Sequence, residues 1–165
     1  MKAPIRFVKV GRKKIQVWHD NFEYYQPNDH ECGDCGIRAV AKALDCSWED
    51  SLTKLFGSAI KIKEAPGSCD NITETLKEYG FKWVPVKPER GSKRPTVSEF
   101  AKNHDGTYIL RVSGHVVCAK DGKYYDIWDS GSKSLYGYWV KEKPAFYQPT
   151  SPFSSRSAIL TLTTD

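Results

Sequence analysis

The strongest constraint on the fold of this chain is a change of hydrophobic period near its middle. Before about residue 104, apolar side chains recur mainly at the three- and four-residue spacing of amphipathic helices. From residue 107 onward, Val, Ile, Tyr and Trp gather in short runs that are typical of strands. Helices followed by strands predict an α+β fold with an antiparallel sheet. A length of 165 residues with 39% hydrophobic content suffices for one core and one domain.

We divide the expected domain into four segments. Alternating residues around the turn at 11–12 predict a hairpin within residues 1–18. Residues 19–104 form the mainly helical half, which begins with a polar loop up to about residue 32. Residues 107–142 carry the antiparallel sheet. Residues 143–165 lack a clear period and are expected to form a surface tail.

Start and stop signals place the helices of the first half. Asp34 precedes a run from Cys35 to Leu44 whose apolar residues share one face, so we expect a helix that Asp34 caps. The other helices are expected over 47–56 (capped by Ser47 and ended by Gly57), 70–79 (capped by Asp70) and about 96–103 (opened by a Thr96–Glu99 capping box).

The strands are expected over 81–86, 107–112, 115–120, 123–128 and 136–140. Asp121-Gly122 is a strong two-residue turn between two of them. Pro85 marks the first strand as an edge or its end, because proline lacks the N–H group that a central strand needs. The later strands therefore predict a hairpin that begins at His115.

Cys35 and His115 are the candidate reactive pair. A cysteine is a good nucleophile only as a thiolate, and a helix start with a nearby imidazole favours that form. Cys35 opens the expected helix. His115 follows Ser113-Gly114, whose small side chains leave the ring accessible. Cys46, Cys69 and Cys118 are expected to be ordinary small core residues.

A histidine base also needs an acceptor that fixes its ring, and the hairpin offers Asp129 and Asp126. With a strict two-residue turn, Asp126 shares a face with His115 two positions away. A turn longer by one residue would place Asp129 directly opposite His115. We choose Asp129 as the third residue and keep Asp126 in reserve.

These residues, in the runs Cys32-Gly33-Asp34-Cys35-Gly36, His115-Val116-Val117 and Trp128-Asp129-Ser130, resemble the papain-like cysteine peptidase superfamily. Their Cys, His, Asp order is also that of the bacteriocin-leader peptidases and the Josephin deubiquitinases. The resemblance covers roughly residues 28–40 and 107–131. It implies a papain-like core and cleavage of a peptide or isopeptide bond through a thioester. Relatives with the same triad carry out deamidation or acyl transfer, which is the alternative reaction class.

The resemblance also implies an amide donor for the oxyanion of the reaction. The family usually has a glutamine a few residues before the nucleophile, and Gln26 is rather distant. Asn28 offers the same donor and is our choice, with Asp29 a poor donor if ionised and His30 a further possibility. The backbone N–H of Cys35 supplies a second donor.

Three alternatives use the same segment differently. Cys32 and Cys35 form a C-x-x-C pair at a helix start, as thiol-disulfide oxidoreductases have, but the expected strands provide no βαβ unit around them. The same pair with His30, Cys46 or Cys69 could bind zinc, but a second ligand pair with zinc-site spacing is absent from the sequence. A protein-binding scaffold without activity is the third alternative.

Composition and charge indicate where such a protein works. Five cysteines at irregular spacing, with no apolar run at the N-terminus, indicate a reducing cytoplasm. No run approaches the length of a membrane span, so we expect no membrane association. The net charge of +5 concentrates in two turn-flanked runs, which favours solvated loops over a nucleic-acid groove. We expect a protein or peptide substrate, no cofactor and no metal. The small size suggests a dedicated, phage- or bacterium-encoded peptidase.

Overall fold

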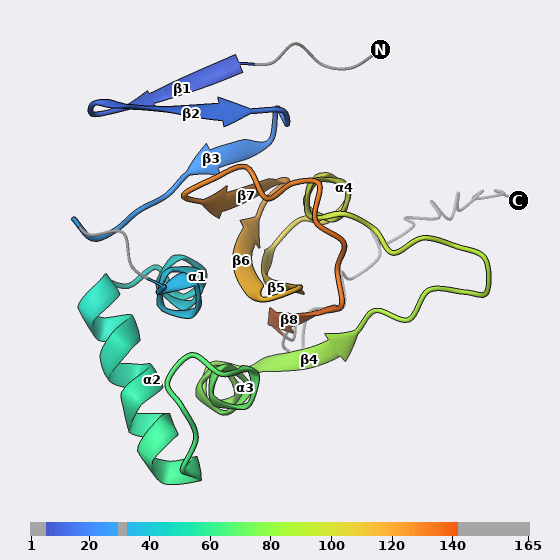
Figure 1. The fold of residues 1–165 in the computed structure, drawn as a ribbon. Coiled ribbons are helices and arrows are strands. Elements are labelled where there is room, and N and C mark those ends of the chain that lie inside the picture. The colour runs from blue at the N-terminus through green and yellow to red at the C-terminus, as the bar shows by residue number, and fades with distance from the viewer. Residues whose placement is uncertain (1–5, 30–32, 142–165) are drawn as a thin grey trace, which may run out of the picture.

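The computed structural model describes residues 6–29 and 33–141, and it confirms a mixed α+β fold (Figure 1). The elements along the chain are β1 (Arg6–Val10), β2 (Lys13–Val17), β3 (Phe22–Tyr24), α1 (Cys35–Leu44), α2 (Trp48–Ile62), α3 (Cys69–Lys77), β4 (Phe81–Pro85), α4 (Val97–Lys102), β5 (Thr107–Val112), β6 (His115–Lys120), β7 (Lys123–Asp126) and β8 (Gly137–Lys141).

A six-stranded sheet forms the centre of the molecule, in the order β3-β7-β6-β5-β8-β4. Its strands pair antiparallel except for β3, which runs parallel to β7. The sequence predicted a purely antiparallel sheet and a loop at β3, so both expectations need correction. β4 is an edge strand, which agrees with the position of Pro85 at its end.

Helices pack on both faces of this sheet. On one face, Ala39 and Val40 of α1 join Ile109 and Cys118 of the sheet in one apolar cluster, which α3 completes. On the other face, Phe100 of α4 packs in a second cluster formed by neighbouring residues of the same strands. Alternate residues of β5 and β6 thus serve opposite faces, as a two-sided sheet requires. α2 packs on α1 and α3 rather than on the sheet.

The helix predictions hold for α1 and α4 and need correction for the other two. α1 begins at Cys35 and ends at Leu44 as predicted, and α4 opens with the Thr96–Glu99 capping box. Gly57 does not end α2, which continues to Ile62 because Ser58 and Ala59, beyond the glycine, are buried against its neighbours. Ser68, rather than Asp70, caps α3.

β1 and β2 form a separate two-stranded hairpin, in which Val17 reaches the core. The hairpin of β6 and β7 carries His115 and Asp126. Its turn is Asp121-Gly122, with φ angles of 48° and 83°. Positive φ at both turn residues is what a tight hairpin needs, so the predicted two-residue turn is confirmed. Cys118 pairs with Tyr125, and continuing this register places Asp126 opposite Val117.

Candidate active site

Cys35 is the first residue of α1, and its side chain is only partly buried. The start of a helix presents unpaired backbone N–H groups and the positive end of the helix dipole, both of which favour a thiolate. Asp34 occupies the cap position, but its side chain makes no capping hydrogen bond. Asp34 is thus the N-cap residue as predicted, but its carboxylate binds Arg38 and Trp48 instead of a backbone N–H of the helix.

The structure brings Cys35 and His115 together. The His115 ring and the backbone N–H of Val116 both hydrogen-bond the Cys35 sulfur. His115 is the first residue of β6, and α1 packs across this strand. The pairing predicted from sequence is thus present.

Asp126 holds the other side of the His115 ring. Its Oδ2 atom lies 2.7 Å from Nε2 of His115, which leaves Nδ1 as the ring nitrogen for Cys35. Asp126 ends β7 and is 2% exposed. The Ser130 hydroxyl and the Ile127 backbone N–H each donate to this carboxylate at 2.8 Å. Asp126 is therefore a fixed acceptor that sets the orientation of His115.

The pKa values of the pair move in opposite directions. Burial alone would lower the pKa of His115, but the hydrogen bonds to Asp126 and Cys35 outweigh it and raise the pKa to about 9. Burial alone would raise the pKa of Cys35, but His115 and the Val116 N–H outweigh it and lower the pKa. Both shifts favour a thiolate beside an imidazolium ion.

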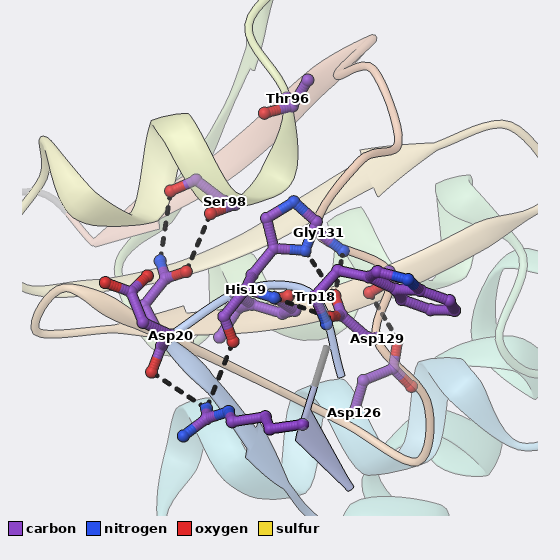
Figure 2. A network of polar contacts seen from close by, with 12 residues as sticks. Trp18, His19, Asp20, Thr96, Ser98, Asp126, Asp129 and Gly131 are labelled. Atoms are coloured by element: carbon purple, nitrogen blue, oxygen red, sulfur yellow. Dashed lines mark hydrogen bonds and ion pairs between the residues drawn. The ribbon is translucent and has the colours of Figure 1, made fainter. Parts of the chain in front are cut away.

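Asp129, our first choice as the partner of His115, lies elsewhere (Figure 2). Its Oδ1 atom lies 2.8 Å from Nδ1 of His19, and its Oδ2 accepts the backbone N–H groups of Trp18 and His19 at 2.6 and 3.0 Å. The Tyr124 hydroxyl and the Gly131 N–H also donate to it. The assignment of Asp129 to His115 is therefore corrected to Asp126. The turn has only two residues. In this register Asp126, and not Asp129, lies on the same face of the hairpin as His115.

Asp129 instead ties the segment after β2 to the loop after β7. Burial would raise the pKa of Asp129, but hydrogen bonds from Tyr124 and the Trp18 backbone N–H outweigh it, so the pKa is lowered. Burial and the neighbouring Asp129 raise the pKa of Tyr124. A carboxylate with this many donors is a structural anchor.

Arg38 is a residue of this site that was not predicted from the sequence. It is 5% exposed, pairs with Asp34 and lies 3.6 Å from Oδ1 of Asp126. The Trp48 indole N–H donates to Asp34 at 2.8 Å. Arg38 is thus a buried cation between two buried carboxylates, and its charge helps to lower the pKa of Cys35. The spacing of four residues between Asp34 and Arg38 on a helix was the signal that could have predicted the pair.

Trp128 covers the His115 ring, with the ring centroids 5.4 Å apart. It lies opposite His115 when the hairpin register is continued. Trp128 is 38% exposed, so one side of it faces solvent.

A hollow of about 200 Å³ opens beside Cys35 and His115. It is lined further by Gly67, Ser68, Cys69, Arg111, Val112, Gly114 and Val116. A side chain at Gly36 would bring its Cβ within 3.3 Å of the Gly67 backbone, so a glycine here lets the loop before α3 approach Cys35 closely. The reactive pair thus borders a space large enough for part of a ligand.

The remaining predicted residues are less defined. Asn28 is partly buried in the segment after β3, and its role as an oxyanion donor stays a prediction. Cys32 and His30, on which the disulfide and zinc alternatives depend, lie outside the described residues, as does the expected tail at 143–165. Within residues 6–29 and 33–141, no three or more His, Cys, Asp or Glu side chains are grouped to hold a metal ion. Cys118 is buried, which raises its pKa to about 12.

Comparisons of this chain with models of protein families, with curated proteins and with solved structures gave no match. None of the helices described is both long enough and apolar enough to cross a membrane.

Proposed function

We propose that this chain is a cysteine peptidase of the papain-like type, which hydrolyses a peptide or isopeptide bond. The observation that carries the proposal is the alignment of Cys35, His115 and Asp126, with Cys35 at the start of a buried helix. A nucleophile next to a base, with the base held by a third group, is the arrangement that covalent catalysis by cysteine requires. The papain-like character of the fold is part of the proposal.

In the first half of the reaction, the Cys35 sulfur attacks the carbonyl carbon of the scissile bond. A C–S bond forms, the carbonyl electron pair moves onto oxygen, and the backbone N–H of Cys35 with Asn28 stabilises that oxyanion. When the oxyanion collapses, the C–N bond breaks. The amine leaves with the proton that His115 donates, and a thioester remains on Cys35.

In the second half, His115 accepts a proton from water, and the resulting hydroxide attacks the thioester. The C–S bond breaks, and the carboxylic acid leaves while Cys35 returns to the thiolate. Asp126 acts as a positioning residue throughout, because it keeps Nε2 of His115 bound and stabilises the imidazolium form. Arg38, 3.6 Å from Oδ1 of Asp126, places a positive charge beside that buried carboxylate.

Brief alkylation with iodoacetamide at a series of pH values, followed by peptide mapping, tests the proposal without a known substrate. We expect Cys35 to react rapidly well below pH 8.5, which is about the pKa of an ordinary thiol, whereas Cys46, Cys69 and Cys118 react slowly. His115→Ala should slow Cys35 selectively, because the thiolate loses its cation. A Cys35 no more reactive than the other thiols, or equally reactive without His115, contradicts the proposal.

Turnover is the second part of the test. The purified protein is incubated with a proteome-derived peptide mixture, and new termini are identified by mass spectrometry. Cys35→Ser should abolish the new termini while the thermal unfolding transition stays close to that of the parent. A Cys35→Ser protein that still cleaves peptides would show that another residue is the nucleophile.

A further inference from the structure

Arg111 lines the hollow beside Cys35 and His115 without taking part in the triad. It lies on β5 directly across from Val116, whose backbone N–H hydrogen-bonds the Cys35 sulfur. It shares a face of the sheet with Ile109, which belongs to the cluster that packs against α1. Arg111 therefore projects from the same face that holds the reactive sulfur.

Of the side chains that the structure describes, an aromatic ring rather than an acid lies beside the guanidinium group of Arg111. Its central carbon lies 6.0 Å from the centre of the Trp83 ring. Trp83 in turn packs on Trp139, with the ring centroids 4.6 Å apart. Such a platform limits the positions of the arginine and leaves its N–H groups available.

Within residues 6–29 and 33–141, no carboxylate neutralises the charge of Arg111. Among the described residues, none forms an ion pair with Arg111, although other cations of the site do have partners. The two buried acids of the site are already engaged, since Asp126 binds His115 and Asp34 binds Arg38. Among the residues that the structure describes, no aspartate or glutamate lines the hollow, while both Arg111 and the imidazolium of His115 contribute positive charge.

We infer that this hollow is a substrate subsite for a carboxylate, so that the preferred peptide carries an acidic group beside the bond to be cleaved. The inference rests on the proposed function, since it assigns a substrate class to the same site. Arginine binds carboxylates through two parallel N–H donors, which makes it a group that selects and orients such a substrate. Arg111 acts in recognition and has no role in bond cleavage.

Two alkylating agents that differ in charge but little in size provide the test. Iodoacetate is an anion and iodoacetamide is neutral, and both alkylate the same sulfur. The ratio of their rate constants at Cys35, measured at one pH and low salt, cancels any change in thiolate content between variants. At separations of several ångströms in a hollow open to water, loss of one cation should lower this ratio by about threefold, and added salt should reduce the difference.

We expect Arg111→Gln to lower the ratio and Arg111→Glu to lower it further, whereas Arg111→Lys keeps it close to that of the parent. Arg94→Gln is the matched control, because Arg94 also stacks on an aromatic ring, that of Tyr136, but does not line this hollow. For the cationic reagent 2-bromoethylamine the order of the variants should be reversed: its rate relative to iodoacetamide should rise in Arg111→Gln and rise further in Arg111→Glu.

A second set of reagents distinguishes the two sources of a carboxylate. Bromoacetyl-glycine carries a chain terminus, bromoacetyl-aspartic acid α-amide carries an acidic side chain, and the amides of glycine and asparagine are the neutral controls. For each acid, the rate at Cys35 is divided by the rate of its neutral amide. The acid with the larger ratio, if Arg111→Gln abolishes the difference, identifies which source of carboxylate the hollow accepts.

The outcomes separate this inference from the proposed function. Slow alkylation of Cys35 that does not depend on His115 overturns the proposed function and the inference with it. Rapid, His115-dependent alkylation with the same ratio in the parent, Arg111→Gln and Arg111→Glu overturns the inference alone.

Discussion

Asp126 and Asp129 are three residues apart in the chain, yet each holds a different histidine. Asp126 Oδ2 lies 2.7 Å from Nε2 of His115, and Asp129 Oδ1 lies 2.8 Å from Nδ1 of His19. Only the first pair contacts Cys35 through its histidine. The two acids are nearly equally buried, so substitutions at the two positions compare a positioning role with a structural one.

Asp126→Asn should raise the pKa of Cys35. The neutral amide stabilises the imidazolium of His115 less than the carboxylate does, so the thiolate loses part of its cationic partner. We expect the alkylation rate of Cys35 at pH 6.5 to fall by about tenfold, because each unit of pKa shift changes the thiolate fraction by about that factor. The measurement is the pH profile of alkylation, whose midpoint should move upward. An unchanged midpoint would show that Asp126 does not support the pair.

Asp129→Asn should leave that midpoint unchanged and destabilise the fold instead. The carboxylate accepts hydrogen bonds from Tyr124, the ring and backbone of His19, and the backbone N–H groups of Trp18 and Gly131. An amide cannot accept from all of them, and we expect a loss of about 3 kcal/mol in the free energy of unfolding. Urea denaturation measures it. A normal free energy of unfolding together with a shifted alkylation profile would reverse the assignment of the two acids.

The raised pKa of His115 predicts a pH-dependent contribution to stability. Its folded value of about 9 exceeds the ordinary 6.5, so the folded state binds the proton more tightly than the unfolded chain. The stabilisation is therefore fully present below pH about 6.5 and is lost as the pH rises through the folded pKa. The Cys35→Ser background removes the opposing titration of the thiol and keeps Asp126 in place.

The comparison is between Cys35→Ser and Cys35→Ser/His115→Gln, by urea denaturation from pH 6 to 10. We expect the difference in unfolding free energy to shrink by about 2 kcal/mol over this range, since glutamine does not titrate. This is less than a pKa of about 9 would give, because in the Cys35→Ser background Asp126 raises the pKa of His115 without the help of the Cys35 sulfur. A difference that is constant with pH would mean that Asp126 does not raise the pKa of His115.

Arg38→Met should be strongly destabilising. It leaves Asp34 and Asp126, which are 4% and 2% exposed, without the cation between them. Uncompensated buried charge costs roughly 3–5 kcal/mol in the free energy of unfolding. Lys61→Met is the control, because it breaks the exposed pair with Glu74 and should change the unfolding free energy little. Equal effects of the two substitutions would contradict the role given to Arg38.

The parts of the site that could be predicted from sequence are those with local signals. The helix from Cys35 to Leu44 has a clear apolar face and a polar start. The β6–β7 hairpin has a turn dipeptide whose backbone preference determines the register. These two elements are enough to predict that Cys35 and His115 form the reactive pair.

The missed features depend on residues far apart in the chain. β3 has only three residues and exists because it pairs with β7, about 100 positions later. α2 continues through Gly57 because packing of the following turn outweighs the weak helix preference of glycine. The choice between Asp126 and Asp129 depends on where the chain leaves β7, and no residue pattern near Asp129 reveals its contact with His19.

Gly131→Ala tests whether the Asp129 anchor is as tightly packed as the structure indicates. A Cβ atom at this position would lie 2.3 Å from the Tyr124 hydroxyl and 2.4 Å from Nδ1 of His19. Both groups hydrogen-bond Asp129, so they cannot move without breaking the anchor. Overpacking of this kind costs about 1–3 kcal/mol, and the broken hydrogen bonds should place the loss in unfolding free energy at the upper end.

Gly57→Ala is the matched substitution, because its Cβ meets nothing within 4 Å inside an exposed turn of α2. That change should stabilise the protein by about 0.5–1 kcal/mol, since alanine favours the helix and restricts the unfolded chain. Opposite signs for the same chemical change, measured by urea denaturation, are expected. If Gly131→Ala leaves the free energy of unfolding unchanged, Tyr124 and His19 can both move aside, and their hydrogen bonds to Asp129 do not anchor the fold.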